Sequence, residues 1–552
     1  MTRTSDRLYR WLASLTVGAL VLVGVGSGTV AVADTTPPAG TPPTVSADGL
    51  PTWQINGVVW SQAVANNIVY VTGSFTKARP PGVAVGGAGE VTALNLFAYD
   101  IRTGNRVTTF NHSLNGQGRA VAAAPDGSRV YVGGEFTTVD GIARGHVAAF
   151  DTATGALVSS FHPNLNNRVR ALAASGPTST GTLFMGGGYG AVNGVTRKSL
   201  SAVSTSTGAL LPWAPTVDNG WVWSMVLAPD RSRVVVGGSF TSLNGQSAYG
   251  MGSLNATTGA SMPWAANKTI RDATSTGAIT SLRTDGVQIY GSGYAYGAGS
   301  SFEGTFAAAP STGAITLIND CHGDTYDVLP VGPVLYSVSH VHDCTAVGGF
   351  PAISVAQRAL AQTVAATTTN KGPDSYGWNY NGLPASTILQ WFPNLVVGTY
   401  TGQSQAAWAL AGNSSYIALG GEFPIVNGVA QQGLVRLAVT SLAPNKQGPT
   451  YLRKSSTQVV PPTTATSPAR GTVKVTFGTA WDYDNQTLTY DVRRDNTTWV
   501  YSAKFTSNFW TLPSESFTDV GLTPGSQHFY QVRITDAFGN TRWSPTSNTV
   551  TS

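Results

Sequence analysis

Val130-Tyr131-Val132-Gly133-Gly134-Glu135-Phe136 is an apolar, strand-like run that ends in a glycine pair and an aromatic residue. Related runs recur along the chain, most of them at intervals of about fifty residues. Such a period is typical of an array in which each copy folds as one unit and packs on the next. The seven copies lie at residues 69–75, 130–136, 183–189, 234–240, 288–294, 334–340 and 417–423.

One copy, residues 119–161, divides into four strands separated by turns. The expected strands are 119–124, 129–137, 146–151 and 156–161. Asp140-Gly141 lies between the second and third strands and favours the positive φ values of a tight hairpin. Asn-Gly holds the same place at 193–194, 244–245 and 427–428.

Four antiparallel strands per copy, repeated radially, predict a seven-bladed β-propeller over residues 51–445. A glycine pair weakens a strand unless another backbone or sheet approaches it closely, and packing between blades would supply that reason. The residue that closes each copy is then expected to fill the space between blades. These closing residues are Phe75, Phe136, Tyr189, Phe240, Tyr294, His340 and Phe423.

The repeat resembles a known family. Gly237-Gly238-x-Phe240-Thr241-x-x-Asn244-Gly245, with Asp-x-x-Thr-Gly turns such as 151–155, is similar to the delta-60-type propeller repeat of secreted bacterial proteins. The resemblance covers residues from about 51 to 445 and implies the fold more strongly than a function. In that family a Cys-His-Gly-Asp segment and a later His-x-His-x-Cys segment recur, which implies a shared site or a shared brace.

A second domain is expected after residues 446–470, which we interpret as a linker or a leading strand. Residues 471–552 contain several short strands with period-two alternation, which indicates an immunoglobulin-like sandwich. Leu522-Thr523-Pro524-Gly525 with Tyr530-Gln531-Val532-Arg533 resembles a fibronectin type III domain. The family's corner tyrosine position is occupied by His528, so Tyr530 takes that role or the corner is altered.

Composition sets further limits. Only 11% of the 552 residues are charged, whereas 42% are hydrophobic. This balance excludes a disordered polyelectrolyte and a coiled coil, and it suits short strands joined by tight turns. The net charge is +5 and Lys and Arg do not cluster after the N-terminus, so no nucleic-acid partner is expected.

The N-terminus has the layout of a secretory signal peptide. Arg3, Arg7 and Arg10 precede an apolar run over about residues 11–25, and Ala31-Val32-Ala33 supplies small residues for cleavage. We therefore predict a signal peptide over residues 1–33, cleaved after Ala33, and a Pro/Thr-rich linker over 34–50. The alternative is a membrane anchor, but the run is short for a span of ~20 residues. The expectation is an extracellular protein with no membrane span after cleavage.

The two cysteines are expected to form a disulfide. A hairpin centred on Gly332-Pro333 pairs Cys321 with Cys344, His322 with Asp343 and Thr325 with His340. Directly opposed residues lie close enough for a disulfide, and export favours oxidation.

The same hairpin holds the candidate site residues, His322, Asp324, His340, His342 and Asp343. Alternation along the strands places His340 and His342 on the face of the cysteines and places His322 and Asp324 on the other. A tetrahedral zinc site needs convergent ligands, so no metal is expected here. Asp482-Tyr483-Asp484-Asn485 is a weaker calcium candidate, because such sites need six to eight oxygens.

These features favour a secreted, non-catalytic binding or scaffold protein that acts at the cell envelope or on extracellular carbohydrate. The repeats use most strand positions for packing, which leaves loops and the channel for a ligand. We expect a polysaccharide or cell-surface ligand, a monomer and no cofactor. The aromatic residues of the insert over 348–404 can stack on sugars, although packing is favoured: Trp378, Tyr380, Trp391 and Tyr400.

The main alternative is a glycoside hydrolase or another polysaccharide-degrading protein, because fibronectin type III modules often accompany such enzymes. That chemistry needs two carboxylates about 5–9 Å apart. Glu135 and Glu422 share one repeat position but belong to blades on either side of the first blade. Asp324 and Asp343 lie beside the expected disulfide, where an overlooked site would lie. A quinone-dependent oxidoreductase is a further alternative that no cofactor-contact pattern supports.

Overall fold

The computed structural model describes residues 41–273, 275–296, 300–374, 376–451 and 462–552. The expected signal peptide and its cleavage position after Ala33 lie outside these residues. Within the described ranges, helical structure is limited to two 3-10 turns, η1 (Ala265–Lys268) and η2 (Thr345–Val347). All other elements are strands, which confirms the all-β class. No described helix is long and apolar enough to cross a membrane.

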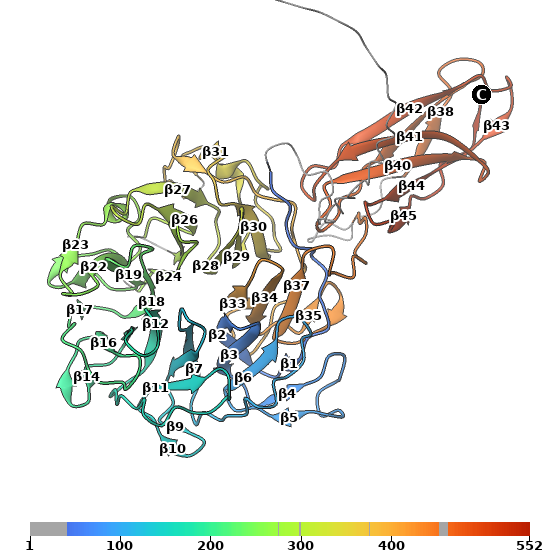
Figure 1. Ribbon diagram of the computed structural model, residues 1–552. Coiled ribbons are helices and arrows are strands. Elements are labelled where there is room, and N and C mark those ends of the chain that lie inside the picture. Colours follow the sequence, from blue (N-terminus) through green and yellow to red (C-terminus); the bar gives the residue numbers. More distant parts are fainter. Residues whose placement is uncertain (1–40, 274, 297–299, 375, 452–461) are drawn as a thin grey trace, which may run out of the picture.

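Seven antiparallel sheets follow one another along residues 58–438 of the described chain, and each corresponds to one copy of the repeat. The first strand of each sheet lies nearest the centre of the arrangement in Figure 1. These inner strands are β2 (Val58–Ala65), β7 (Gly118–Ala123), β12 (Val169–Ser175), β18 (Val222–Leu227), β24 (Gly277–Thr284), β28 (Thr325–Val331) and β33 (Ala407–Gly412).

The second strand of each sheet carries the repeated run itself. These strands are β3 (Ile68–Ser74), β8 (Arg129–Gly134), β13 (Thr182–Gly187), β19 (Arg233–Gly238), β25 (Ile289–Ala295), β29 (Val334–Val341) and β34 (Tyr416–Gly421). The third strands are β6 (Leu96–Asp100), β11 (Val147–Asp151), β16 (Leu200–Ser204), β22 (Met251–Asn255), β26 (Gly304–Ala308), β30 (Gln357–Thr363) and β37 (Leu434–Ala438).

The inner strands of neighbouring sheets contact one another, and β33 of the last sheet contacts β2 of the first. Figure 1 shows the resulting radial, propeller-like arrangement. Apolar clusters lie between neighbouring sheets. One of them, for example, combines Val69 and Val71 of β3 with Ala409 of β33 and Ala418 of β34. The core is therefore divided among the sheet interfaces.

Fourth strands are less regular than the repeat predicts. Only β22 and β26 are followed by a paired outer strand, β23 (Ser261–Met262) and β27 (Ile315–Asp320), in the described sheets. In the first three sheets the expected fourth strand is reduced to a single bridge, such as Phe150 with Leu157. The chain turns inward soon after this bridge, because Phe161 is fully buried between two sheets. The prediction of four strands in every blade is thus wrong for these sheets.

The predicted tight turns are confirmed. Asp140 and Gly141 have φ values of 50° and 79°, and the three Asn-Gly pairs have similar values. Each turn closes a small two-stranded hairpin. The hairpins are β9 (Thr138–Val139) with β10 (Ile142–Ala143), β14 (Ala191–Val192) with β15 (Val195–Thr196), β20 (Ser242–Leu243) with β21 (Gln246–Ser247), and β35 (Ile425–Val426) with β36 (Val429–Ala430).

Other short strands belong to three small sheets that are separate from the seven main ones. They are β1 (Gln54–Ile55), β4 (Lys77–Arg79), β5 (Val91–Thr92), β17 (Val217–Asp218), β31 (Thr368–Thr369) and β32 (Pro384–Ala385). Strand β4 pairs with β1 and β5, β17 pairs with β20, and β31 pairs with β32.

The glycine pairs are explained by two different close approaches. A Cβ on the first glycine would strike the next sheet: at Gly237 it would lie 2.8 Å from Ile279 Cγ2, and at Gly420 it would lie 2.6 Å from Val59 Cγ1. A Cβ on the second glycine would strike the inner strand of the same sheet: at Gly238 it would lie 2.0 Å from the Trp221 carbonyl oxygen. The expectation that glycine permits close packing between sheets is confirmed.

The N-terminal segment differs from the expected linker. Residues 44–48 are buried. The backbone N–H of Ser46 donates to the Ala438 carbonyl at 2.8 Å, and Leu50 bridges to Arg436. The segment therefore runs along β37, the outer strand of the last sheet, and ties the start of the described chain to its seventh copy.

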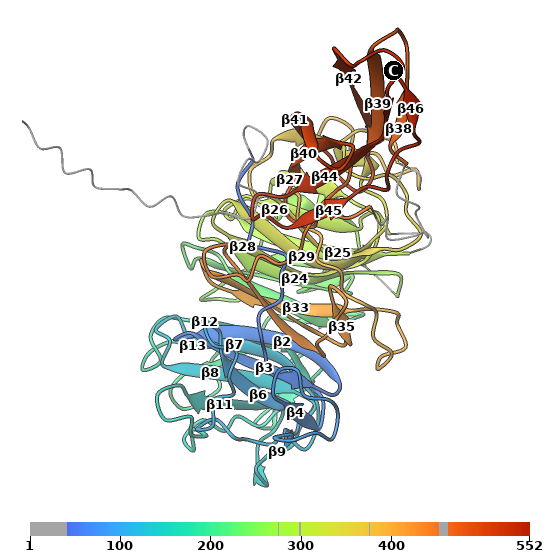
Figure 2. The same cartoon turned by 90° about the vertical axis from the view of Figure 1, so that its right-hand side faces the viewer.

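The C-terminal residues form two facing sheets. One contains β38 (Thr464–Thr466), β39 (Thr472–Gly478) and β42 (Ser514–Val520). The other contains β41 (Thr498–Thr506), β40 (Thr487–Arg494), β44 (Tyr530–Thr535) and β45 (Thr541–Trp543). A short pair, β43 (Gln527–His528) with β46 (Val550–Thr551), completes the unit. Figure 2 shows this unit beyond the edge of the radial sheets.

Residues from both facing sheets share one apolar cluster, which includes Val475 of β39 and Val532 of β44. The Tyr530 hydroxyl donates to Asp519 at 2.9 Å, whereas His528 Nδ1 lies 2.7 Å from Asp495 Oδ2. Tyr530 therefore uses its hydroxyl group for a hydrogen bond within this unit, whereas His528 contacts Asp495 instead.

The predicted disulfide between Cys321 and Cys344 is present, with a Cα–Cα distance of 4.3 Å. Strands β28 and β29 pair in the predicted register from Val331 to Asp327. A bulge then shifts the register, so that Thr325 faces Ser339 and not His340 as predicted. The register is restored at His322 and Asp343, beside the disulfide.

The disulfide lies where the C-terminal unit meets the radial sheets. Cys321 and Cys344 belong to one apolar cluster with Phe392, Trp481 and Phe509. The Phe392 ring packs edge-on against Phe509 at 5.0 Å, and Phe392 N–H donates to the Tyr483 carbonyl at 2.9 Å. The bond therefore braces the hairpin against which the second unit packs.

Substitution of Gly238 by Ala is expected to destabilise the protein by about 1–3 kcal/mol, because the new methyl group meets backbone that cannot move independently. Chemical denaturation would measure the change in the free energy of unfolding. Gly190→Ala is the matched control, since its Cβ would have only an ordinary contact at 3.7 Å. Equal stability of the two variants would contradict this account of the glycine pairs.

Removal of the disulfide with Cys321→Ser and Cys344→Ser should lower the free energy of unfolding by about 3 kcal/mol, because a loop with a sequence separation of 23 is released in the unfolded state. Denaturation of the single and double variants should give the same loss. Mass spectrometry of the wild-type protein after non-reducing digestion should recover the linked peptides, and two free thiols would refute the bond.

Candidate functional site

Every inner strand carries a β-bulge at the same place. In each case one residue has no partner in the ladder between the inner strand and the second strand. Bulges of this kind redirect a side chain and are frequent near functional sites. The seven bulge residues are Trp60, Arg119, Arg170, Trp223, Thr280, Tyr326 and Trp408.

The glycine pairs are linked to these bulges. The carbonyl group two residues before Trp223, that of Trp221, projects over Gly238 and accepts the N–H of Ser239 at 3.1 Å. The equivalent carbonyl before Trp408 projects over Gly421 and accepts the N–H of Glu422 at 2.7 Å. The second glycine of the motif is thus the residue that accommodates the bulge.

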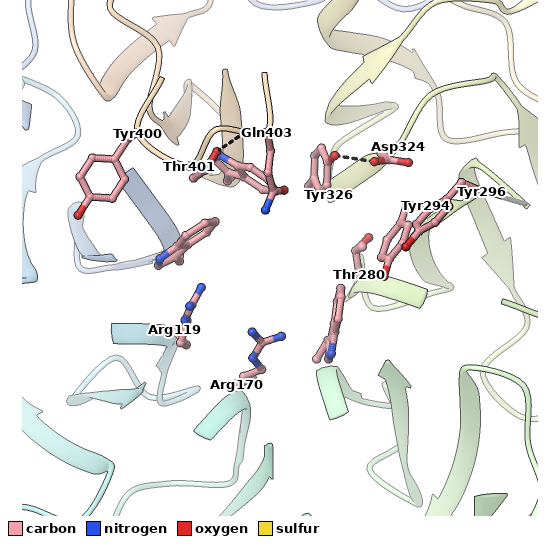
Figure 3. Close-up of a pocket in the computed structure, with 13 residues that line it drawn as sticks. Arg119, Arg170, Thr280, Tyr294, Tyr296, Asp324, Tyr326, Tyr400, Thr401 and Gln403 are labelled. Carbon is pink, nitrogen blue, oxygen red and sulfur yellow. Dashed lines mark hydrogen bonds between the residues drawn. The ribbon is translucent and has the colours of Figure 1, made fainter. Parts of the chain in front are cut away.

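All seven bulge residues line one cavity of about 660 Å³, which therefore lies among the inner strands of the seven sheets. Six further residues complete its wall: Tyr294, Tyr296, Asp324, Tyr400, Thr401 and Gln403. Figure 3 shows Arg119 and Arg170 pointing into the same space as Tyr294 and Tyr326. The volume is that of a typical small-molecule or oligosaccharide site.

Aromatic rings form two arcs in this wall. Tyr326 lies 4.3 Å from Trp408, which packs edge-on against Trp60 at 5.1 Å. On the other side Trp223 stacks on Tyr294 at 5.7 Å. Rings in such arcs offer apolar faces beside polar edges, an arrangement that suits a sugar ring with its C–H and O–H groups.

Two arginines lie between the aromatic arcs. Arg119 lies over the Trp60 ring at 4.6 Å, and its Nε is 3.2 Å from Glu135 Oε1. Arg170 lies over Trp223 at 5.2 Å, but it makes no ion pair within the described part of the chain, and its buried Nε has no hydrogen-bond partner there. Burial, followed by the nearby positive charges of Arg119 and Arg168, lowers the pKa of Arg170 to about 10.

The arginines therefore leave positive charge directed at the cavity. Glu135 is shared by Arg119 and Arg168, so it does not neutralise Arg170 directly. An uncompensated guanidinium in a partly desolvated wall favours an anionic ligand that offers two oxygens. This is the strongest chemical preference of the site.

Asp324 is the one carboxylic acid among the lining residues. It accepts a hydrogen bond from the Tyr326 hydroxyl at 2.8 Å, and burial raises its pKa to about 6. Gln405 Nε2 donates to Tyr326 Oη at 2.9 Å, and Gln405 Oε1 accepts from Arg358 at 3.1 Å. This chain of contacts fixes the Tyr326 ring at the cavity wall.

The candidate residues predicted from the sequence do not form one site. Asp324 lines the cavity, and His340 Nδ1 lies 4.0 Å from its Oδ2. The expectation that these two residues lie on opposite faces is wrong, because the bulge at Tyr326 interrupts strand alternation. Burial, with a contribution from Arg358, lowers the pKa of His340 to about 4, so this imidazole is neutral and lies against Gln405.

The other three candidates lie apart from the cavity wall. His322 is buried beside the carboxylates of Glu303 and Asp374. His342 lies between the two other histidines, with ring centroids 6.4 Å from His322 and 6.5 Å from His340. Asp343 Oδ1 accepts the backbone N–H of Thr345 at 2.8 Å, which is a local turn contact.

Three acidic residues near His322 were not singled out from the sequence: Asp320, Asp374 and Glu303. Asp320 precedes His322 by two residues and shares its strand face, which is the only local signal. Asp374 comes from the insert, far away in sequence. Burial raises the pKa of Asp320 to about 8, and the neighbouring His322 opposes that shift.

In the segment considered as a calcium site, residues 482–485, a carboxylate oxygen of Asp484 already accepts hydrogen bonds from protein donors. Asp484 Oδ2 accepts from Ser46 Oγ at 2.9 Å and from the backbone N–H of Ala47 at 2.6 Å. The Asp482–Asn485 segment therefore holds the buried N-terminal segment against the C-terminal unit. Burial raises the pKa of Asp484, with smaller opposing contributions from these donors.

The channel was expected to be available to a ligand, but the residues that line the cavity were not predicted. A signal was present, because six of the seven copies have a large polar or aromatic residue in the first strand, usually between small or β-branched neighbours, and the fifth has Thr280 there. Glu135 and Glu422, noted for their shared repeat position, hold Arg119 and Trp408 in the wall. Of the four aromatic residues of the insert, Tyr380 and Trp391 are buried as expected, whereas Tyr400 reaches the cavity.

Comparisons with known proteins add no family. No family model and no curated protein matches the chain. A mitotic checkpoint complex structure matches at 9% identity and a TM-score of 0.41, over 73% of this chain and 97% of that one. The structure of the Niastella koreensis GH74 enzyme matches at 12% identity and a TM-score of 0.39, over 90% of this chain and 67% of that one. The structure of dihydro-heme d1 dehydrogenase NirN matches at 13% identity and a TM-score of 0.31, over 86% of this chain and 77% of that one. No function is transferred from these likenesses.

Proposed function

We propose that this protein is a secreted, non-catalytic binding protein whose central cavity holds an anionic carbohydrate. The observation that carries the proposal is the cavity wall, in which Arg170 has no acidic partner among the described residues and lies beside stacked aromatic rings. Neutral sugars require stacking and hydrogen bonds alone, whereas a uronate or sulfate group also satisfies a guanidinium. Acidic polysaccharide of the cell envelope or the extracellular medium has this chemistry.

The architecture that we propose for this function is a closed seven-bladed β-propeller followed by a fibronectin type III domain. Support comes from the contact of β33 with β2 and from the close approach of Gly420 to Val59, which join the last sheet to the first. The C-terminal unit supports the second assignment with its two facing sheets and shared core. Closure keeps the seven bulge residues at fixed distances around one ligand.

Export by a signal peptide over residues 1–33 is part of the proposal. The disulfide is consistent with an oxidising compartment. A monomer with no resident cofactor remains our expectation, and the carbohydrate is the partner. The fibronectin-like unit packs against the disulfide hairpin, away from the cavity-lining residues.

A glycoside hydrolase is the second candidate, because Asp324 is a carboxylic acid in the cavity wall. Hydrolysis by the common mechanisms requires a second carboxylate at about 5–9 Å on the other side of the bond. The described residues that line the cavity do not supply one. Glu135 and Glu422 already accept hydrogen bonds from Arg119 and Trp408, so binding is the better-supported function.

Substitution of Arg170 by Gln should weaken binding of uronic-acid oligosaccharides about tenfold or more, because a charge-assisted hydrogen bond is worth roughly 1.5–3 kcal/mol. Binding of a neutral oligosaccharide of equal length should change little. Isothermal titration calorimetry at two salt concentrations would measure both, and only the charged ligand should lose affinity in high salt. Arg102→Gln is the matched control, since Arg102 pairs with Asp100 on an exposed turn.

Trp408→Ala should weaken the binding of both the charged and the neutral oligosaccharide, because it removes a stacking face that does not depend on charge.

Preference of the wild type for the neutral oligosaccharide, or equal binding of the charged one by the Arg170 variant, would contradict the anionic assignment. In the same samples, release of reducing ends that disappears in Asp324→Asn would establish the hydrolase alternative instead.

A further inference from the structure

Three buried side chains from two segments of the chain converge near the disulfide. Asp320 ends β27, His322 lies at the start of the disulfide hairpin, and Asp374 lies between β31 and β32. One ligand atom from each lies within 4.8 Å of the other two. Asp320 is 2% exposed, and the side chains of His322 and Asp374 are each 3% exposed.

The atoms that face one another lack hydrogen-bond partners. Within the described chain this holds for Asp320 Oδ1, for both ring nitrogens of His322 and for Asp374 Oδ2. His322 Nε2 lies 2.9 Å from Asp374 Oδ2, but the two atoms are not aligned as a hydrogen bond. Only one ring nitrogen of His322 can face Asp320 and Asp374, because Nδ1 lies 3.6 Å from Glu303 Oε2. Each unsatisfied buried polar group costs roughly 1–3 kcal/mol, so three converging atoms, one from each residue, point to a missing ligand.

The supporting contacts hold these atoms in place. Asp374 Oδ1 accepts the backbone N–H groups of Tyr376 and Trp378 at 2.9 and 2.8 Å, which leaves Oδ2 directed at His322. The His322 backbone is fixed by hydrogen bonds to Asp343 and His342 at 2.7 and 2.8 Å. The site is therefore built from the surrounding fold, because its ligands are oriented by contacts on their other sides.

The charge of the cluster indicates what is missing. Glu303 Oε2 lies 3.6 Å from His322 Nδ1, so three acidic side chains surround one imidazole. The ion pairs of the described residues include no Lys or Arg at these acids. Buried carboxylates need a positive partner, and a single histidine cannot balance three of them.

We propose that Asp320, His322 and Asp374 bind one divalent transition-metal ion, such as Zn²⁺ or Mn²⁺, with Glu303 as a neighbouring acceptor. An imidazole among the ligands favours these ions over Ca²⁺, which takes six to eight oxygens. The ion would join β27, the disulfide hairpin and the insert, and it would complement the disulfide as a second cross-link. This proposal is independent of the carbohydrate assignment, since none of the three ligands lines the cavity.

The test uses the whole purified protein, freed of metal with a chelator and dialysed against Zn²⁺, Mn²⁺ or Ca²⁺ separately. Elemental analysis should find one Zn²⁺ or Mn²⁺ per chain, and the thermal midpoint should rise with that ion and not with Ca²⁺. Asp374→Asn and His322→Gln should each reduce affinity by about ten- to a hundredfold or more. Asp343→Asn is the matched control on the same hairpin, because its carboxylate caps a turn.

Co²⁺ provides a readout that does not depend on stability. Its visible absorption spectrum should appear with the wild type and with the Asp343 variant, and it should be absent with the His322 variant. Circular dichroism shows whether each variant is folded. Absence of stoichiometric Zn²⁺ and Mn²⁺ from the folded wild type, or unchanged binding in folded Asp374 and His322 variants, would overturn the proposal. Stoichiometric Ca²⁺ in their place would overturn the choice of ion.

Discussion

The close approach of backbone at the glycine pairs is the constraint on which the architecture depends. The first glycine lets the next sheet pack against its strand, as at Gly237 and Ile279. The second lets a carbonyl of the inner strand project over it, as at Gly238 and Trp221. A side chain at either place would separate strands or sheets that are in contact, so sheet packing and strand shape are set together.

The same constraint creates the cavity. The projecting carbonyl belongs to a bulge, and the bulge directs one side chain per sheet into the cavity at the centre. The neighbouring positions are small or β-branched in six of the seven sheets, whereas the residue at the bulge varies among the sheets. The sheets can therefore share the same backbone arrangement and still present tryptophan, arginine, threonine or tyrosine at the cavity wall.

The fifth and sixth sheets depart furthest from the repeat, and local specialisation is concentrated there. The residue that packs between sheets in the other copies is Tyr294 in one, where it lines the cavity, and His340 in the other, where it lies beside Asp324. The disulfide, the insert and the C-terminal unit gather around the sixth sheet. A regular repeat cannot bury an added domain and a long insert, so its sequence changes where they attach.

Much of the fold follows from local pattern. Residue spacing predicted the all-β class, the seven copies, the Asp-Gly and Asn-Gly turns and the Cys321–Cys344 bond, because strands, turns and a hairpin register depend on near neighbours in the chain. The two-sheet C-terminal unit also follows from alternation. Four complete strands in every copy did not follow, because burial of residues such as Phe161 ends the strand early.

The sites were decided by tertiary structure. A bulge adds one residue and shifts alternation, so the side-chain face predicted for His340 changed without any change in composition. The cavity gathers one residue from each of seven copies, and the Asp320, His322 and Asp374 cluster joins segments more than fifty residues apart. Strand patterns reflect near neighbours in the chain, whereas the convergence of charges and rings depends on how the sheets pack around the centre and on where the insert folds back.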